Sequence, residues 1–314
     1  MQGEDFKERD NMSYEGFCTC VKIDIQHILT GAKVIVQKVV KNNGISKQGL
    51  IIMENEGSNV TPTIYLESFY HAYLEGRKLE WIVQDILIAY QMHKPLWNFD
   101  SEAFRDWNWV KERIVCRLIN REMNRDYLDR VPHVPYLDLA VTFAWVADSE
   151  LLGDDINIPI YNSHLEMWGV TVKELYAIAM KNTQRLLPPI IQEIREAILS
   201  MGVEMDSLSP EEQSAGFQMY ILSNEKRHYG AVYMLYKDVL KDFADRMGSD
   251  LYILPSSVGE LILIPTWKCG NPAGLRDIVC IVNMEHVEPD EILSDNVYRF
   301  TRQTGEITIQ GEEE

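Results

Sequence analysis

The chain has 314 residues, enough for one large domain or two ordinary ones, and 46% of them are hydrophobic, so a substantial core can form. Its formal net charge of −18 argues against binding to the phosphates of nucleic acid, which requires clustered Lys and Arg. No apolar run approaches the roughly 18 residues of a membrane-spanning helix, so no membrane partner is expected.

The first 17 residues are polar and mixed in charge, without the basic and apolar regions of a signal peptide. The five cysteines are scattered, an odd number that fits reduced thiols better than a disulfide framework. Together these observations predict a cytoplasmic protein. Residues 1–11 and the acidic tail 311–314 are expected to be disordered.

The N-terminal third predicts a helix followed by a β-hairpin. The helix is expected over about 12–30. Two β-branched runs, beginning at Lys33 and Leu50, flank Asn42-Asn43-Gly44, and Asn and Gly tolerate the positive φ of a tight hairpin turn. Helical spacing then extends from Pro62, and a further helix is expected over about 78–92.

The middle third predicts a mostly helical segment over 101–130 and strands over 135–147 and 155–161. Thr171 and Glu174 form a capping box that begins a helix, which ends before Pro188-Pro189. Another helix is expected to follow and to reach about Met201.

The last third mixes strands and helices without βαβ alternation. Strands are predicted over 217–223, 250–254 and 260–265, helices ending at Met247 and spanning about 274–284, and a final hairpin over 297–309. This order predicts an α+β fold with a mixed, largely antiparallel sheet and flanking helices. One integrated domain over 12–310 is expected, with a shallow internal boundary near 202–213.

Charge is strongly segregated along the sequence. Segments 131–172, 196–225 and 277–298 each hold six acidic residues and no Lys or Arg, whereas the bases gather in 33–47 and 105–130. The pattern predicts extended acidic surfaces and one or two positive islands.

Four arginines recur every fourth residue and would form a cationic row on a helix: Arg113, Arg117, Arg121 and Arg125. With Lys33, Lys38 and Lys41, they are the candidate site for an anion or an acidic partner. The alternative interpretation is a solvated helix face with ordinary surface ion pairs.

The candidate catalytic residues are two serines beside a carboxylate, Ser256, Ser257 and Glu260, together with His133 and His228. The serines lack the Gly-x-Ser-x-Gly sequence of a nucleophile elbow, which favours a turn in which they satisfy backbone groups. His228 lies in the polar segment 224–230, which either lines a site or is a hairpin tip.

No cofactor or metal is expected. The seven histidines form no His-x-x-x-His pattern, and no glycine-rich phosphate-binding loop is present. A metal held jointly by His133, His164 and nearby acids is the alternative.

Several phrases together resemble an uncharacterised family of domain-of-unknown-function proteins from clostridial gut bacteria, over about residues 12–310. They are Lys41-Asn-Asn-Gly, Pro62-Thr-Ile-Tyr-Leu-Glu, Arg117-Leu-Ile-Asn with Asn124, Pro135-Tyr-Leu-Asp-Leu, Trp168-Gly-Val-Thr with Glu174-Leu-Tyr, Lys181-Asn-Thr, Leu254-Pro-Ser-Ser, and Leu293-Ser-Asp with Val297-Tyr. The layout is also similar, more remotely, to another uncharacterised family of bacterial cytosolic proteins. The resemblance implies a lineage and a cytoplasmic setting but no activity. Family members commonly have His between the hydrophobic residue and Glu where this chain has Val258-Gly259-Glu260, which weakens the case for a hydrolase.

The sequence therefore favours a non-enzymatic interaction or regulatory protein that docks a protein partner. The first alternative is a hydrolase acting on a small anionic substrate, which requires an acid, a His and an Arg to converge in a pocket. The second is an acidic mimic of nucleic acid, which requires carboxylates spaced like phosphates along one face.

Overall fold

The computed structural model describes six stretches of the chain, 12–54, 59–94, 99–147, 157–196, 219–268 and 273–311. They fall into two compact units. The first unit takes in the described residues up to Asp100 except Asn42–Gly44; the second takes in Asn42–Gly44 and the described residues from Ser101 onward. One integrated domain over 12–310 stays a prediction. The boundary expected near 202–213, the segment 1–11 and the tail residues 312–314 lie outside the described residues.

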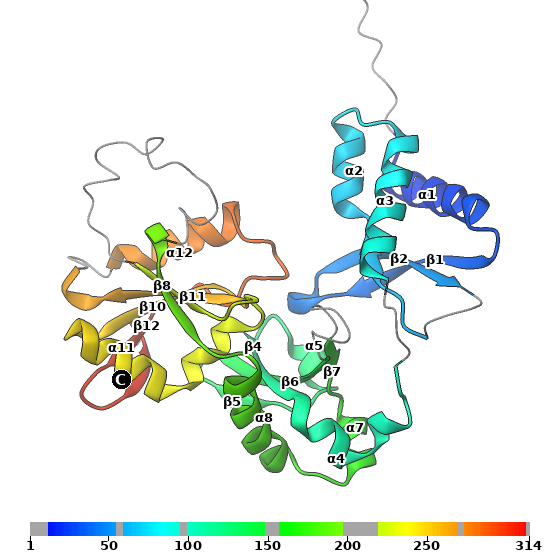
Figure 1. Ribbon diagram of the computed structural model, residues 1–314. Coiled ribbons are helices and arrows are strands. Elements are labelled where there is room, and N and C mark those ends of the chain that lie inside the picture. The colour runs from blue at the N-terminus through cyan, green and yellow to red at the C-terminus, as the bar shows by residue number, and fades with distance from the viewer. Residues whose placement is uncertain are drawn as a thin grey trace, which may run out of the picture. The chain divides into compact units, whose positions relative to one another are not determined.

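The first unit packs helices against a three-stranded antiparallel sheet in the order β1-β2-β3 (Figure 1). Its elements are α1 (Tyr14–Ile28), β1 (Ala32–Val40), β2 (Ser46–Glu54), β3 (Thr63–Tyr65), α2 (Glu67–Leu74) and α3 (Leu79–His93). The first helix, the hairpin and the third helix were predicted correctly. The helix expected from Pro62 begins only at Glu67, because Thr63–Tyr65 first pairs with β2.

Turn chemistry explains the β1–β2 hairpin, and apolar burial explains the rest of this unit. Asn43 and Gly44 adopt φ of 58° and 70°, the left-handed conformation that the sequence predicted for the turn. Phe17 and Val21 of α1, Leu50 of β2 and Ile86 of α3 are at most 3% exposed and share one apolar cluster. Burial of such side chains is the main stabilising contribution to the unit.

The second unit contains two antiparallel sheets. A four-stranded sheet has the order β4-β6-β5, with β7 also paired to β6, and α8 packs on β4. A six-stranded sheet has the order β13-β12-β10-β11-β9-β8, with α12 and α11 on its two faces (Figure 1). The helices are α4 (Trp107–Val110), α5 (Arg125–Leu128), α7 (Asn162–Trp168), α8 (Val172–Leu186), α11 (Lys237–Met247) and α12 (Ala273–Glu285). The strands are β4 (Ile114–Asn120), β5 (Val134–Tyr136), β6 (Leu139–Val146), β7 (Asn157–Pro159), β8 (Ile190–Glu193), β9 (Tyr220–Ser223), β10 (Leu251–Ser257), β11 (Glu260–Pro265), β12 (Tyr298–Thr301) and β13 (Glu306–Ile309).

Three predictions for this unit were wrong. Segment 101–130 is not mostly helical, because the β-branched run at 114–119 forms the buried strand β4. The single strand over 135–147 is two strands, since Leu137 at φ 52° turns the chain between β5 and β6. The helix expected after Pro189 is replaced at its start by β8, which pairs with β9.

The other predicted elements were confirmed. Thr171 and Glu174 form the capping box of α8, and Gly248 ends α11 at φ 66°. Because every strand pairing among the described residues is antiparallel and the helices flank the sheets, the α+β fold class is confirmed. Among the described residues, no helix is both long and apolar enough to cross a membrane.

Candidate functional site

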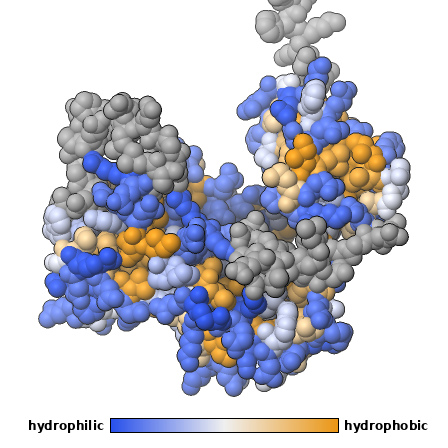
Figure 2. Space-filling view, viewed as in Figure 1, coloured by the Kyte–Doolittle hydropathy of each residue, from blue (hydrophilic) through white to orange (hydrophobic). Residues whose placement is uncertain are grey.

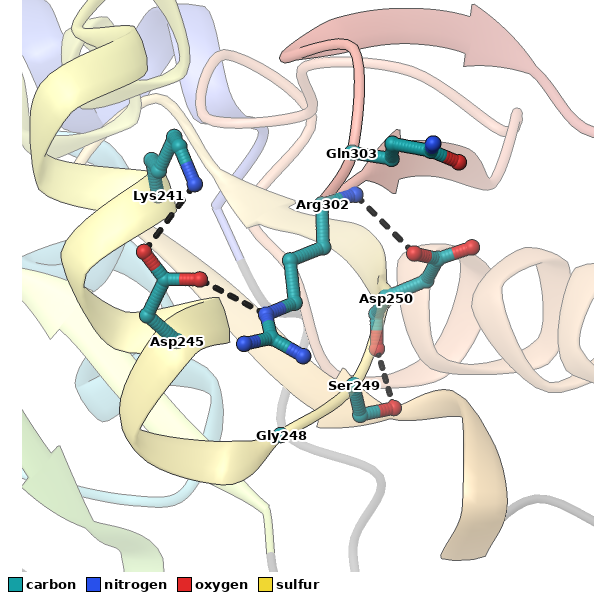
Figure 3. A pocket seen from close by; sticks show the side chains of 7 residues that line it. All are labelled: Lys241, Asp245, Gly248, Ser249, Asp250, Arg302 and Gln303. Atoms are coloured by element: carbon teal, nitrogen blue, oxygen red, sulfur yellow. Dashed lines mark hydrogen bonds and ion pairs between the residues drawn. The ribbon is translucent and has the colours of Figure 1, made fainter.

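The second unit has an open surface pocket of about 530 Å³ at the C-terminal end of α11 (Figure 3). The residues that line it are Lys241, Asp245, Gly248, Ser249, Asp250, Arg302 and Gln303. Charged side chains of both signs therefore share one surface depression.

Strand pairing assembles this pocket. Helix α11 ends at Gly248, and β10 starts directly afterwards. Leu251 of β10 pairs with Phe300 of β12, so Arg302 follows β12 into the same place. Arg302 is more than fifty positions from Asp245 and Asp250, so no local motif signalled the pocket in the sequence.

Arg302 lies between the two carboxylates of the pocket (Figure 3). Its Nε donates a hydrogen bond to Asp245 Oδ1 at 2.6 Å, and its backbone amide donates to Asp250 Oδ1 at 2.9 Å. Lys241 Nζ contacts Asp245 Oδ2 at 3.0 Å, and Arg299 donates to Asp250 Oδ2 at 2.8 Å. The charges of the pocket therefore largely neutralise one another.

The pKa values of the pocket carboxylates argue against proton transfer. Hydrogen bonds from Arg302 and Lys241 lower the pKa of Asp245. Partial burial raises the pKa of Asp250, but the hydrogen bonds from Arg299 and the Arg302 amide outweigh it, and the net pKa is lowered. A general acid or base works best with a pKa near the operating pH, so these groups are suited to binding rather than catalysis.

The candidate hydrolase residues meet only in part, at the β10–β11 hairpin. Ser256 Oγ donates to Glu260 Oε1 at 3.4 Å, and Glu260 Oε2 lies 3.6 Å from Arg227 Nη1. Ser257 Oγ accepts a hydrogen bond from the Gly259 amide at 3.0 Å, the turn role that the alternative interpretation gave it. Ser256 and Glu260 are therefore in contact through a long hydrogen bond.

The loop 224–230 packs against this hairpin. Gly230 is required there, because a Cβ at this position would lie 2.2 Å from the Gly259 carbonyl oxygen. Asn224 organises the loop by accepting from the His228 amide at 3.2 Å and donating to its carbonyl at 2.7 Å. Half-buried His133 lies after α5 instead, with Nδ1 3.2 Å from the Val131 carbonyl oxygen.

The cationic row does not exist as predicted. Arg113 ends a 3₁₀ turn, Arg117 lies on β4, Arg121 lies in the turn after β4, and Arg125 begins α5. Because the four arginines belong to different elements, the four-residue spacing does not place them on one helix face. Arg125 is exposed and paired with Glu122, an ordinary surface pair.

The three lysines of the first unit do not form one cluster either. Exposed Lys33 and Lys38 are five residues apart on β1, so they point to opposite faces of the sheet. The Nζ of Lys41 is 3.3 Å from the Tyr65 hydroxyl and 4.4 Å from the centre of the Tyr65 ring.

Two of the acidic segments are only partly described by the structure. Residues 148–156 of segment 131–172 and residues 197–218 of segment 196–225 lie outside the described stretches, so the spacing of the carboxylates along one face is not defined. Within the described stretches, no group of three or more His, Cys, Asp or Glu residues could hold a metal ion.

Helix α3 carries a second apolar stripe, which was not predicted from the sequence. Trp81, Ile88 and Met92 are 61%, 57% and 76% exposed, and their spacing of seven and four residues places them on one face of the helix. The opposite face carries the buried residues Ile82, Val83, Ile86 and Tyr90. Figure 2 shows hydrophobic residues gathered over α1 and α3 in the first unit. The continuous apolar composition of this helix was a signal for the stripe.

A similar stripe lies on α12, where Ile278, Ile281 and Met284 are exposed. The neighbouring residues 269–272 lie outside the described stretches, so the surroundings of this stripe are less completely defined.

No curated protein and no solved structure matches this chain. A family model does match, over residues 14–302 of the 314, and its description is a family of unknown function. The expected membership of an uncharacterised family is thereby confirmed, and the chain belongs to DUF5688.

Proposed function

We propose that this protein is a non-enzymatic interaction or regulatory protein, and that it binds a partner protein through the exposed apolar stripe of α3. The observation that carries the proposal is the stripe itself. A helix that is apolar on two opposite faces normally buries both of them, and α3 buries only one within its own unit. Contiguous exposed apolar surface is characteristic of protein contact sites.

The partner surface that we propose is the apolar face of a helix. Residues 81–92 span about 16 Å, or three turns, which matches a helix of similar length laid along the stripe. Trp and Met are enriched at the centres of such contacts. Asp85 is the one charged residue within the stripe, and it already pairs with Arg77 at 2.5 Å.

Charge also supports an apolar contact. Residues 12–94 hold eight acidic and eight basic residues, so the net charge of −18 lies entirely outside this stretch. Contact with the first unit therefore meets little net repulsion, and it gains little from electrostatic steering. The separate positions of the predicted cations favour this interpretation over docking through a basic patch.

We place the protein in the cytoplasm, where thiols stay reduced. The four described cysteines, Cys18, Cys20, Cys116 and Cys280, are free. Burial raises the pKa of the Cys116 thiol to about 12, so this thiol stays protonated at neutral pH.

The test compares proteins captured from a lysate of the source organism by the wild-type chain, Ile88→Asp and Gln91→Asp. Both variants add one negative charge to an exposed position of α3, but only Ile88 lies in the stripe. We expect a partner that wild type and Gln91→Asp retain, and that Ile88→Asp retains about tenfold less. Binding should survive raised salt, because the stripe carries no unpaired charge.

If no captured protein depends on Ile88, the proposal is wrong. If the dependent protein is the chain itself, as light scattering of the purified protein would show, the surface is a homodimer contact and the proposed partner is wrong.

A hydrolase is the weaker candidate, and the contact between Ser256 and Glu260 is the observation that favours it. Against it, this hydrogen bond is long, at 3.4 Å, and His133 lies elsewhere, after α5 and beside the Val131 carbonyl. Loss of a hydrolytic activity in Ser256→Ala, with retention in Ser257→Ala, would establish it.

A further inference from the structure

Arg117 is the central residue of β4, an edge strand of the four-stranded sheet, and its buried Nε has no hydrogen-bond partner. On β4 it pairs in register with Thr142 of β6, which is fully buried. The Nε of Arg117 and the Oγ1 of Thr142 are both buried and form no hydrogen bond. Among the described residues, no carboxylate forms an ion pair with Arg117.

Two tyrosines flank this arginine. Its guanidinium carbon lies 4.9 Å from the centre of the Tyr229 ring. Burial raises the pKa values of Tyr127 and Tyr229, and the positive charge of Arg117 opposes both shifts, so Arg117 is close to both side chains. The raised values keep both hydroxyls protonated at neutral pH, and neither hydroxyl has a hydrogen-bond partner in the described part of the chain.

This arrangement is costly unless another group completes it. A buried donor without an acceptor costs about 1–3 kcal/mol, and more when the group is charged. A cation–π contact returns only about 0.5–2 kcal/mol. Buried arginines are normally paired with a carboxylate or a phosphate. In the described part of the chain, the cation and three hydroxyl groups lie in one region and no carboxylate forms an ion pair with Arg117, although the charge of Glu291 acts on Tyr229.

We propose that Arg117 anchors a binding site for the oxyanion group of a small ligand, a carboxylate or a phosphate monoester. The forked N–H groups of the guanidinium match the two oxygens of either group. Half-buried Arg117, Tyr127 and Tyr229 reach the surface, so the ligand approaches from solvent. The hydroxyls of Thr142 and the two tyrosines provide neutral donors around the anion.

The site is independent of the contact proposed for α3, because it lies in the second unit. It also gives one of the four predicted arginines the anion-binding role that the helical row would have given to all of them.

The test follows the Nε–H resonance of Arg117 in nitrogen–proton correlation spectra of the full chain, assigned by its absence from Arg117→Lys. Sodium phosphate and sodium acetate are titrated separately, with sodium chloride at equal ionic strength as the reference. We expect a saturable shift of this resonance with at least one oxyanion and no such shift with chloride. Saturation by phosphate alone assigns a phosphate group to the ligand, and saturation by acetate alone assigns a carboxylate. Saturation by both shows that the site recognises the pair of oxygens that the two groups share.

The same binding is measured in variants as the rise in the midpoint of thermal unfolding that the oxyanion produces. Arg117→Gln should reduce this rise about tenfold or more. Tyr229→Phe, which keeps the ring, should reduce it several-fold. Arg125→Gln is the matched control, because this exposed arginine already has a partner, and it should leave the rise unchanged. If neither oxyanion moves the Arg117 resonance more than chloride does, or if Arg117→Gln responds like wild type, the proposal is wrong. The wild-type spectra decide the question even if a variant fails to fold.

Discussion

The two units bury different kinds of side chain. All the buried polar residues among the described stretches belong to the second unit: Asn43, Asn124, Thr142, Asn182, Thr183, Ser223, Asn224, Ser249, Asn283, Asp290 and Ser294. The buried residues of the first unit are apolar, apart from the tyrosine hydroxyl of Tyr90 and the thiol of Cys18. Hydrophobic pattern therefore specifies the first unit, whereas specific hydrogen bonds between distant segments help to specify the second.

The carboxylate of Asp138 shows how the second unit is held together. It accepts hydrogen bonds from the Ser294 hydroxyl at 2.6 Å, the Tyr298 hydroxyl at 2.8 Å and the Asn296 amide at 3.0 Å. One side chain at the β5–β6 turn thus organises a segment about 160 residues further along the chain. The charge of Asp138 adds to burial in raising the pKa of Tyr298, which keeps that hydroxyl a donor.

The largest loss should follow from opening the apolar core of the first unit. Phe17→Ala removes a ring that is fully buried and lies 5.3 Å from the ring of Tyr70. We expect the free energy of unfolding to fall by about 4 kcal/mol, measured by urea denaturation. Ile23→Ala, at a 46% exposed position of the same helix, should cost less than about 1 kcal/mol. Equal losses in the two variants would contradict the assignment of the core.

A slightly smaller loss should follow from removing the acceptor in the second unit. Asp138→Ala leaves three donors without their acceptor, and one of them, the Tyr298 hydroxyl, belongs to a fully buried residue. The expected cost is about 3 kcal/mol by the same measurement. Asp126→Ala, on the exposed surface of α5, should change stability by no more than about 0.5 kcal/mol. If Asp138→Ala is as stable as this control, hydrogen bonds to Asp138 do not stabilise the second unit, and the proposed difference between the two units is wrong.

Asn43 lies in the β1–β2 turn but belongs to the second unit, so it also tests how far hydrogen bonds between distant segments stabilise that unit. Its side-chain amide donates to the carbonyl oxygens of Pro289 at 2.9 Å and Ile292 at 2.7 Å, while its φ is 58°. Asn43→Ala should cost about 2–3 kcal/mol, because it loses these two hydrogen bonds and the one that the Asn43 side-chain oxygen accepts from Asn124, and it strains the backbone. Asn43→Gly loses the bonds without the strain and should be about 1 kcal/mol more stable than Asn43→Ala. If the two variants are equally stable, the left-handed turn contributes nothing, and a loss below about 0.5 kcal/mol in both would show that the bonds contribute nothing.

The same difference explains how much of the fold the sequence predicted. Helix α1, the β1–β2 hairpin and α3 follow from local periodicity and from the Asn-Gly turn, so their prediction succeeded. The failures lie in the second unit. The segment 101–130 was predicted to be mostly helical, but pairing with β6 and packing against α8 determined a strand over Ile114–Asn120.

The candidate sites were less predictable than the fold. Asp245 and Arg302 meet only because β10 pairs with β12, and no spacing along the chain indicates such a contact. Arg117 was identified as an anion-binding candidate, but its significance lies in the absence of a buried partner, which only the folded structure shows. Ser256 and Glu260 are neighbours in sequence, and their contact was the one feature of the hydrolase hypothesis that local reasoning located.

The smallest effect should come from a purely local device, the capping box of α8. The Thr171 hydroxyl accepts from the Glu174 amide at 3.3 Å, and the Glu174 carboxylate accepts from the Thr171 amide at 2.8 Å. Thr171→Ala should lower the free energy of unfolding by about 1 kcal/mol at neutral pH, and Thr171→Ser should nearly restore it. Hydrogen bonds from the Thr171 amide and hydroxyl lower the pKa of Glu174 below 4.5, so the ionised carboxylate stabilises the fold above that pH. This stabilisation is lost as the pH falls through the lowered pKa, because the folded state must then take up the proton. The difference between wild type and Thr171→Ala should therefore shrink between about pH 7 and about pH 3. A difference that stays constant over this range would show that the carboxylate takes no part in the cap.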